Sequence, residues 1–316
     1  MDFFLHIGMQ KAGSKAIQRF LGQNSDFLKG RGLDCALDLR SGIWHEHIFT
    51  NYDGATDEKL NAMTYLSPAA VLSFERAYAA PNQTIEALLS HCRSAKVIFF
   101  CREPVAWANS MKNQVLKAHR TRLSDWQALT FESGRYTVGL ESGAHLERWE
   151  QMLGRSAIRS VAFKPQINVV PVFADWLGVP AETLASDSAP LENPNRALDA
   201  YGIRVMLDVK RRIIDTDDAT HVEAVKLCHA VLSDRMVDTR TQAAPLLLTP
   251  EEIEECHTKF GHGMNSVLKR YGGGSGFTLE EQAPAMTCFT PTSEERDLAR
   301  EIVARARANN PGNSAT

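Results

Sequence analysis

Short apolar runs, each closed by glycine or by a polar residue, recur through the first half of the chain. Five of them have the length and composition of buried strands, at residues 3–7, 33–39, 69–74, 96–101 and 158–163. Segments in which apolar residues recur at helical spacing lie between them. This alternation predicts an α/β fold with a three-layer parallel sheet, in which ligands bind at the carboxyl ends of the strands.

In the second half, apolar residues recur almost entirely at helical spacing. Helices are predicted at residues 197–236, 249–271 and 293–308. The second of these has a strong start, because Thr249 can cap the helix and Glu252 can complete a capping box. We therefore expect a largely helical C-terminal half.

The expected organisation has three parts. Residues 1–200 form a nucleotide-binding α/β core, residues 201–276 a helical extension packed on that core, and residues 277–316 a C-terminal helix with a polar tail. Within the core, residues 40–66 are polar and are predicted to be a loop with short helices. The loop at residues 181–196 is rich in Pro, Ser and Asn.

Composition narrows the class of protein. The chain has 316 residues, of which 44% are hydrophobic and 23% charged, as in soluble globular proteins. A net charge of −3 argues against general nucleic-acid binding, and no apolar run has membrane-spanning length. The six cysteines are widely spaced without a CxxC pair, which favours reduced thiols. The first predicted strand leaves no room for a signal peptide, so we expect a cytoplasmic protein.

The first twenty-one residues carry the clearest functional signal. The apolar run that ends at Ile7 is followed by Gly8, a tight polar loop and a helical pattern from Lys15. A strand, a glycine-bounded loop and a helix N-terminus together form a geometry that holds a phosphate group on backbone N–H groups. Lys11 adds a full positive charge to this loop.

A Walker A loop is one interpretation of this stretch. Gly8 and Gly13 have the separation of that motif, but Ser14-Lys15 stands where Lys-Ser or Lys-Thr is needed. The strand at residues 96–101 is followed by Arg102, where a Walker B carboxylate would be expected. A P-loop kinase or NTPase would therefore need a variant loop, and this alternative stays open.

The same loop resembles that of sulfotransferases that use 3'-phosphoadenosine 5'-phosphosulfate (PAPS). Their loop approximates I-G-x-x-K-T-G-T-T, and this chain has the sequence IGMQKAGSK at residues 7–15. Their second motif is a strand followed by R-[D/N]-P and by a serine eight residues after the arginine. Here, Arg102-Glu103-Pro104 is followed by Ser110 at that offset.

The resemblance implies a set of site residues. The implied cofactor-binding residues are Lys11, Ala12, Gly13, Ser14, Lys15, Ala16, Arg102 and Ser110. In the family, the arginine and the serine hold the 3'-phosphate, and a guanidinium is suited to bidentate phosphate binding. Ala12 and Lys15 depart from the family pattern, which has threonine at both positions.

Softer similarities extend over residues 3–200. The segment Ser73-Phe74-Glu75-Arg76-Ala77 follows a strand, as a catalytic glutamate segment does in carbohydrate sulfotransferases. The stretch at residues 161–178 looks like a later strand and helix of bacterial members. The polar loop at residues 192–196 lies where many members close over the nucleotide.

The implied mechanism is in-line sulfuryl transfer to a hydroxyl or amine of a carbohydrate or small-molecule acceptor. Glu75 is the candidate base, and Lys11 is the candidate that stabilises the leaving phosphate oxygen. Glu75 could equally be a helix N-terminal carboxylate or an ion-pair partner. The loop and the lysine can meet the phosphate charge, so no metal is required. The sequence leaves the oligomeric state open.

Two histidines flank Glu46 in the segment Trp44-His45-Glu46-His47. His47 is a candidate catalytic residue, since histidine titrates near neutral pH. Both histidines could equally be surface loop residues, and no third ligand close in sequence supports a metal site. Three hypotheses follow: a PAPS-dependent sulfotransferase, a variant P-loop kinase or NTPase, and a non-catalytic nucleotide-binding protein.

Overall fold

The computed structural model describes residues 1–36, 39, 45–50, 52–129, 131, 137–164, 167–180, 197–235, 245–272 and 289–310. The chain divides into two compact units. A sheet unit comprises Met1–Pro104, Thr137–Glu192 and His257–Thr278, and a helical unit comprises Val105–Tyr136, Asn193–Cys256 and Leu279–Thr316. These units do not coincide with the segments 1–200, 201–276 and 277–316, and those boundaries stay a prediction.

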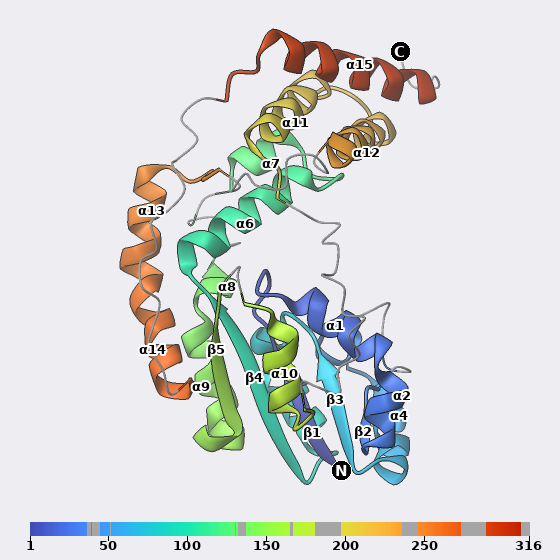
Figure 1. Ribbon diagram of the computed structural model, residues 1–316, viewed down its shortest axis with the longest axis vertical. Helices are drawn as coiled ribbons and strands as arrows, with labels where there is room; N and C mark the ends of the chain where they lie inside the picture. Colours follow the sequence, from blue (N-terminus) through green and yellow to red (C-terminus); the bar gives the residue numbers. More distant parts are fainter. Residues whose placement is uncertain are drawn as a thin grey trace. The chain divides into compact units, whose positions relative to one another are not determined.

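The sheet unit is built on five strands that all run parallel. The strands are β1 (Asp2–His6), β2 (Leu33–Asp34), β3 (Ala69–Ser73), β4 (Ser94–Arg102) and β5 (Ile158–Phe163). Their order in the sheet is β2-β3-β1-β4-β5, so β1 is central and lies between β3 and β4 (Figure 1). Every strand pair is parallel, which confirms the predicted α/β class.

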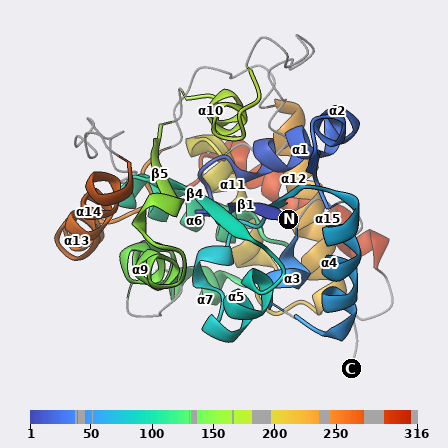
Figure 2. The same cartoon turned by 90° about the horizontal axis from the view of Figure 1, so that it is seen from below.

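Helices cover both faces of this sheet (Figure 2). On one face lie α1 (Ser14–Gln23), α2 (Ser25–Gly30) and α10 (Val169–Trp176), and on the other lie α3 (Glu46–Thr50), α4 (Gly54–Leu66), α5 (Asn82–Leu89) and α9 (Ser142–Leu153). Aromatic rings join the layers, because Phe4 of β1 packs edge-on against Trp176 of α10 at 5.4 Å. The sheet unit therefore has the predicted three layers.

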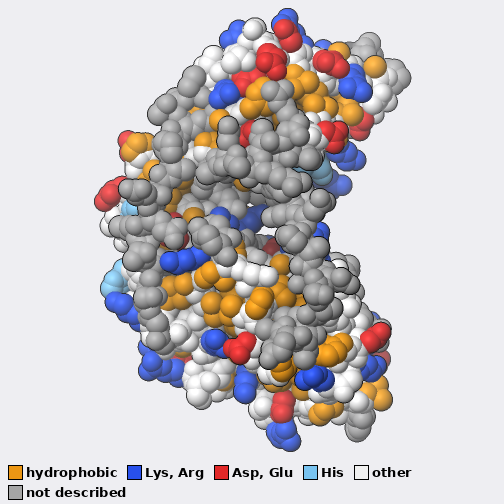
Figure 3. Space-filling view, viewed as in Figure 1, with side chains coloured by type: hydrophobic (Ala, Val, Ile, Leu, Met, Phe, Trp, Pro, Cys, Tyr) orange, Lys and Arg blue, Asp and Glu red, His pale blue; other side chains and the backbone are white. Residues whose placement is uncertain are grey.

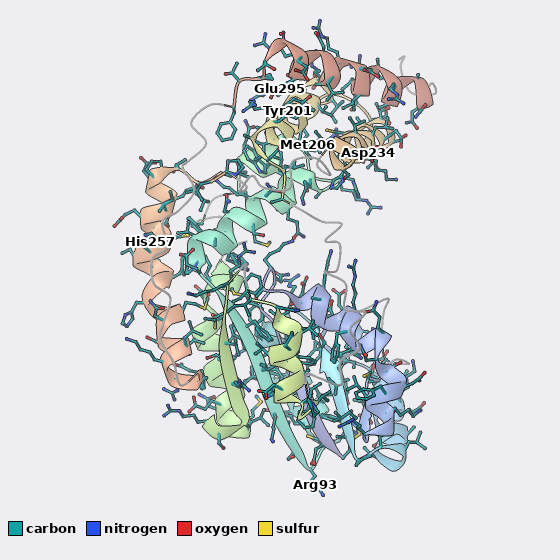
Figure 4. The ribbon with its side chains drawn as sticks, in the orientation of Figure 1. Arg93, Tyr201, Met206, Asp234, His257 and Glu295 are labelled. Carbon is teal, nitrogen blue, oxygen red and sulfur yellow. The ribbon has the colours of Figure 1, made fainter. Side chains whose placement is uncertain are left out.

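The helical unit has its own apolar core. Its elements are α6 (Pro104–Lys117), α7 (Leu123–Gln127), α11 (Ala200–Arg212), α12 (Asp218–Arg235), α13 (Pro250–Cys256) and α15 (Ser293–Asn309). Buried leucine, isoleucine and valine side chains of α6, α7, α11, α12 and α15 pack together. On α15, the carboxylate of Glu295 is 1% exposed and binds Arg204 of α11 at 2.6 Å (Figure 4).

The predicted helix starts and ends are largely confirmed. Thr249 and Glu252 form the expected capping box, with Glu252 Oε2 accepting from the Thr249 N–H at 2.9 Å. The predicted helix at 249–271 continues from α13 through a π-helical turn, His257–Gly261, into α14 (His262–Tyr271). The remaining short helix, α8 (Thr137–Leu140), precedes α9. The predicted loop at 181–196 lies outside the described residues.

Two predictions within residues 33–66 were wrong in length. The strand expected at 33–39 forms β2 over Leu33–Asp34, and the described residues 35, 36 and 39 are not in a strand. The Asp34 carboxylate accepts from the Ala36 N–H at 2.8 Å, which turns the chain. The polar segment expected to be a loop with short helices contains α4, which has 13 residues. Its N-cap is Asp53, whose carboxylate accepts from the Thr56 N–H at 2.8 Å. Polarity concealed this helix because α4 has little continuous apolar surface.

Other global expectations concern the membrane, the thiols and the surface. No helix among the described residues has the length and hydropathy needed to cross a membrane. The cysteines of the described residues are free thiols, and Cys288 lies outside them. On the face drawn in Figure 3, acidic and basic side chains are interspersed, in keeping with the net charge of −3.

The glycine after β1 gives the first testable prediction. Gly8 has φ +131°, and a Cβ placed on it would lie 2.6 Å from the Glu75 carbonyl oxygen. Gly8→Ala combines a left-handed backbone with this overlap, so it should lower the free energy of unfolding by about 2–4 kcal/mol. Chemical denaturation measures this loss.

Gly154→Ala is the matched control, because Gly154 has φ +81° but open space around its Cα. It should cost only about 1–2 kcal/mol, the backbone contribution alone. Equal losses for the two variants would show that overlap with the Glu75 carbonyl oxygen adds no cost to a Cβ at position 8.

Candidate functional site

The chain after β1 remains tied to β4 as it enters the loop. The N–H of Met9 donates to the Phe100 carbonyl at 3.1 Å, and the N–H of Phe100 donates to the Gly8 carbonyl at 2.8 Å. The start of the loop therefore lies directly beside the last residues of β4. On the side of β3, the Glu75 carbonyl oxygen comes so close to Gly8 that a Cβ at this position would lie 2.6 Å from it. Position 8 therefore requires glycine.

Two left-handed residues shape the loop itself. Lys11 has φ +64° and Gly13 has φ +89°, and the Gly13 carbonyl accepts from the Ala16 N–H at 2.9 Å to begin α1. The Ser14 hydroxyl donates to the Met9 carbonyl at 3.2 Å, which closes the loop on itself. Ala12 is fully buried. These contacts hold the loop in one conformation before any ligand arrives.

The closed loop leaves backbone donors unused. No hydrogen bond of the described residues engages the N–H groups of residues 11–15. The first turn of α1 also contains no acidic side chain, and Gly13 provides no side-chain cap. Unused N–H groups at a helix N-terminus carry partial positive charge and bind anions.

Arg102 completes β4 and reaches the same loop. Its Nη1 donates to the Lys11 carbonyl at 2.7 Å, and its guanidinium lies 5.5 Å from the centre of the Phe163 ring of β5. Its Nε is buried and makes no hydrogen bond with the described residues. Burial lowers the pKa of Arg102 to about 10, an effect that Glu103 opposes, so the side chain stays a cation at neutral pH.

Lys11 and Glu75 face each other across the ends of β1 and β3. Burial lowers the pKa of Lys11 to about 8, and the negative charge of Glu75 opposes this shift. Burial also raises the pKa of Glu75, against the positive charges of Lys11, Lys15 and Arg76 and together with the negative charge of Glu46. Each group is therefore closer to its neutral form than an exposed side chain would be.

The cations of this cluster lack ordinary ion-pair partners. None of the salt bridges within the described part of the chain includes Lys11, Lys15 or Arg102. Half-buried positive charge without an ion pair is costly, and an anionic ligand would relieve that cost. The chain leaves β1 toward β2 and leaves β4 toward β5, so the cluster lies at the switch point where ligands bind parallel sheets.

The structure brings together most of the residues predicted from sequence. Lys11, Ala12, Gly13, Ser14 and Lys15 form the loop and the first residues of α1. Glu75 and Arg102 join them from β3 and β4. Ala16 uses its N–H within the helix, so it has no backbone donor for a ligand. The roles given to all these residues stay predictions.

Two further predicted residues belong to other elements of the fold. Ser110 is on α6 in the helical unit, and its contact with a 3'-phosphate stays a prediction. His47 is on α3 with its side chain 46% exposed, and its Nε2 lies 3.5 Å from the Asp53 carboxylate. In the structure, Asp53 is therefore the partner of the His47 side chain. The catalytic role of His47 stays a prediction.

Neither role expected for His45 from the sequence, in the site or on the surface, fits the structure. His45 is fully buried and is hydrogen-bonded to Ser73 at the end of β3, so it is neither a surface loop residue nor accessible to a substrate. The Met9 sulfur, which accepts from the Arg102 N–H at 3.3 Å, was also missed. Among the described residues, no group of three His, Cys, Asp or Glu side chains could hold a metal ion.

Comparisons with known proteins add little beyond this geometry. No protein-family model and no curated protein matches the chain. One solved structure that matches is described as a sulfotransferase from Alicyclobacillus acidocaldarius, with 18% identity and a TM-score of 0.42, over 70% of this chain and 94% of that one. At this identity and score, the likeness establishes neither a family nor an activity.

The burial of Lys11 makes stability depend on pH in a defined direction. In the folded protein the pKa of Lys11 is about 8, against an ordinary value of 10.5, so its charged form is destabilising below pH 8. Lys11→Met should raise the free energy of unfolding at pH 7 by up to about 3 kcal/mol. The gain should shrink as the pH rises from 8 to 10.5, since the folded protein then loses the proton first.

Denaturant unfolding at a series of pH values measures this dependence. Lys29→Met, at an exposed position of α2, is the control and should change stability little at any pH. A Lys11→Met gain that stays constant from pH 7 to 10.5 would contradict the assignment of Lys11 as a partly desolvated cation outside any salt bridge.

Proposed function

We propose that this chain is a sulfotransferase that uses PAPS as sulfuryl donor and a hydroxyl or amine of a carbohydrate or small molecule as acceptor. One observation carries the proposal. The guanidinium of Arg102 and the ammonium of Lys11, neither in an ion pair with the described residues, meet at the switch point of the sheet. The spacing of these cations in the sequence matches two motifs that hold the two phosphate groups of this nucleotide.

The donor would be bound by backbone as much as by side chains. The N–H groups of residues 11–15 would hold the 5'-phosphate, and Arg102, with Ser110, would hold the 3'-phosphate. The Arg102 Nε is buried and has no partner among the described residues, so it has a donor to offer. Lys15 adds a cation in place of the expected threonine hydroxyl.

The transfer itself needs one base and one stabilising cation. The sulfur–oxygen bond of the phosphosulfate breaks as a bond forms from sulfur to the acceptor oxygen or nitrogen. The acceptor proton passes to the Glu75 carboxylate, which burial makes a stronger base than an exposed glutamate. The 5'-phosphate leaves with an additional negative charge, which the Lys11 ammonium stabilises.

The side chains at positions 12 and 14 are consistent with donor binding through the backbone. The Ala12 side chain is buried in the fold, and the Ser14 hydroxyl donates its proton to Met9. Neither side chain is arranged to donate to a phosphate. These same contacts motivate the second candidate, a nucleotide-binding protein without transfer activity.

Thermal stability with nucleotides tests the binding step. 3'-Phosphoadenosine 5'-phosphate, the product of the donor, should raise the Tm, and at 100 times its Kd should add about 2.7 kcal/mol to stability. ADP, which lacks the 3'-phosphate, should give a smaller shift at equal concentration. Arg102→Ala should remove the difference between the two nucleotides.

Arg93→Ala is the matched control. Arg93 precedes β4 at the opposite end of the sheet and pairs with Asp2 at 2.7 Å, so its loss should leave the nucleotide shift intact (Figure 4). No shift with 3'-phosphoadenosine 5'-phosphate at millimolar concentration would overturn the proposed function. A larger, Mg²⁺-dependent shift with ATP would favour a kinase or NTPase.

Transfer from sulfate-labelled PAPS across a panel of hydroxylated and amino acceptors tests turnover. Glu75→Gln should retain nucleotide binding and lower the transfer rate by about 10²–10⁴-fold, the usual contribution of a general base. Binding without transfer to any acceptor would favour the non-catalytic alternative. Full activity of Glu75→Gln would remove Glu75 from the mechanism.

A further inference from the structure

The end of β3 loses its neighbour on one side. β2 pairs with β3 only at Leu33 and Asp34, opposite Ala69 and Ala70. On the other side β1 continues to the end of the strand, and the Phe74 N–H donates to the His6 carbonyl at 3.0 Å. Since backbone groups alternate sides along a strand, the N–H and carbonyl of the preceding residue, Ser73, point toward the missing neighbour.

His45 takes the place of that neighbour. Its backbone N–H donates to the Ser73 carbonyl at 3.2 Å, and its Nδ1 accepts from the Ser73 N–H at 3.0 Å. Its Nε2 lies 3.2 Å from the carbonyl oxygens of both Cys35 and Ala36, which follow β2. One residue therefore spans the gap between the diverging strands and satisfies backbone groups on both.

These partners also decide the chemical state of the ring. A nitrogen that accepts from an N–H carries no proton, and a nitrogen between two carbonyl oxygens must donate. His45 is therefore protonated at Nε2 and bears its lone pair on Nδ1. Both ring nitrogens are used by the backbone, which leaves His45 no free group for chemistry.

The segment that His45 fixes leads directly to the site. Glu75 lies two residues beyond Ser73, and its carbonyl oxygen is so close to Gly8 that a Cβ added there would lie 2.6 Å from it. The helix α3 begins immediately after His45, and its Phe49 stacks on Phe74 with ring centres 5.9 Å apart. The path between Ser73 and Glu75 is thus held on one side by β1 and on the other by His45 and α3.

We propose that His45 is a positioning residue for Glu75: its bonds to Ser73 and to the chain after β2 hold the end of β3 where the Glu75 carboxylate is half-buried and within the electrostatic influence of Lys11. This inference rests on the proposed function only where it gives Glu75 a catalytic role. The effect of His45 on the position of the Glu75 carboxylate does not depend on that role. Without His45, the end of β3 would lose its bonds on one edge, and Glu75 would gain access to water.

The titration of Glu75 in the nucleotide-free protein tests the inference. Carbon-13 labelling of glutamate carboxyl groups follows each titration by NMR, and Glu75→Gln identifies the signal. The charged groups that face Glu75 are Lys11, Lys15, Arg76 and Glu46. All four remain in a His45 variant, so a change in the titration reports a change in position.

His45→Phe keeps the ring volume but removes both ring hydrogen bonds. The Glu75 midpoint should fall by about one pH unit as the carboxylate gains solvent. His45→Asn keeps an acceptor for the Ser73 N–H but reaches Cys35 and Ala36 less well, so it should shift the midpoint in the same direction by less. It serves as the deciding variant if His45→Phe does not fold.

Ser73→Ala is the matched control. It removes the bond between the Ser73 hydroxyl and His6 Nδ1, 2.8 Å long and fully buried, while the backbone bonds to His45 remain. It should lower stability without moving the Glu75 midpoint. An unchanged midpoint in a folded His45 variant, or an equal shift in Ser73→Ala, would overturn the inference.

The binding of 3'-phosphoadenosine 5'-phosphate separates this inference from the proposed function. His45→Asn should keep the wild-type affinity within a few-fold, because the loop and Arg102 hold the nucleotide. If the wild-type protein does not bind the nucleotide, the proposed function fails while the Glu75 titration still decides the role of His45.

Discussion

The hydrogen bonds that continue from β1 into the loop, between residues 8–9 and Phe100, fix the geometry on which the site depends. They keep the loop level with the end of β4, so that Arg102 can donate to the Lys11 carbonyl at 2.7 Å. The same pairing leaves the other side of Gly8 open to the backbone of Glu75. Three strand ends thereby contribute to one cluster, although Lys11 and Arg102 are more than ninety residues apart in the sequence.

Such a cluster lowers the stability of the free protein and favours the binding of an anion. Lys11 and Arg102 are half-buried in the free protein and form no salt bridge with the described residues, and this partial loss of hydration opposes folding. The loop pre-forms its shape with Ser14 and Gly13, so binding an anion would cost little reorganisation. The free energy that a phosphate returns by neutralising these charges would then be available for affinity. Packing of the helices on both faces of the sheet offsets the folding free energy lost at these cations.

Much of this fold could be predicted because its signals are local. Apolar runs marked β1, β3, β4 and β5, and Gly8, Gly13 and Lys11 marked the loop between a strand and a helix. The convergence of Lys11, Glu75 and Arg102 followed from the rule that parallel strands end at one edge of the sheet. The predictions that failed depended on hydrogen bonds from side chains to the backbone, which the hydrophobic pattern does not show. Asp34 shortened β2 by binding the backbone, and His45 paired with Ser73 across 28 residues.

A contact beneath the loop links it to a helix far away in sequence. Gly13 lies so close to α10 that a Cβ on it would come within 2.8 Å of a Val169 methyl group. The loop after β1 and the residue at the first position of α10 therefore constrain each other. A chimera that carried a loop from another protein into this sheet would need a smaller side chain at position 169 if its loop had no glycine at position 13. Otherwise the new Cβ would overlap Val169 and displace the loop.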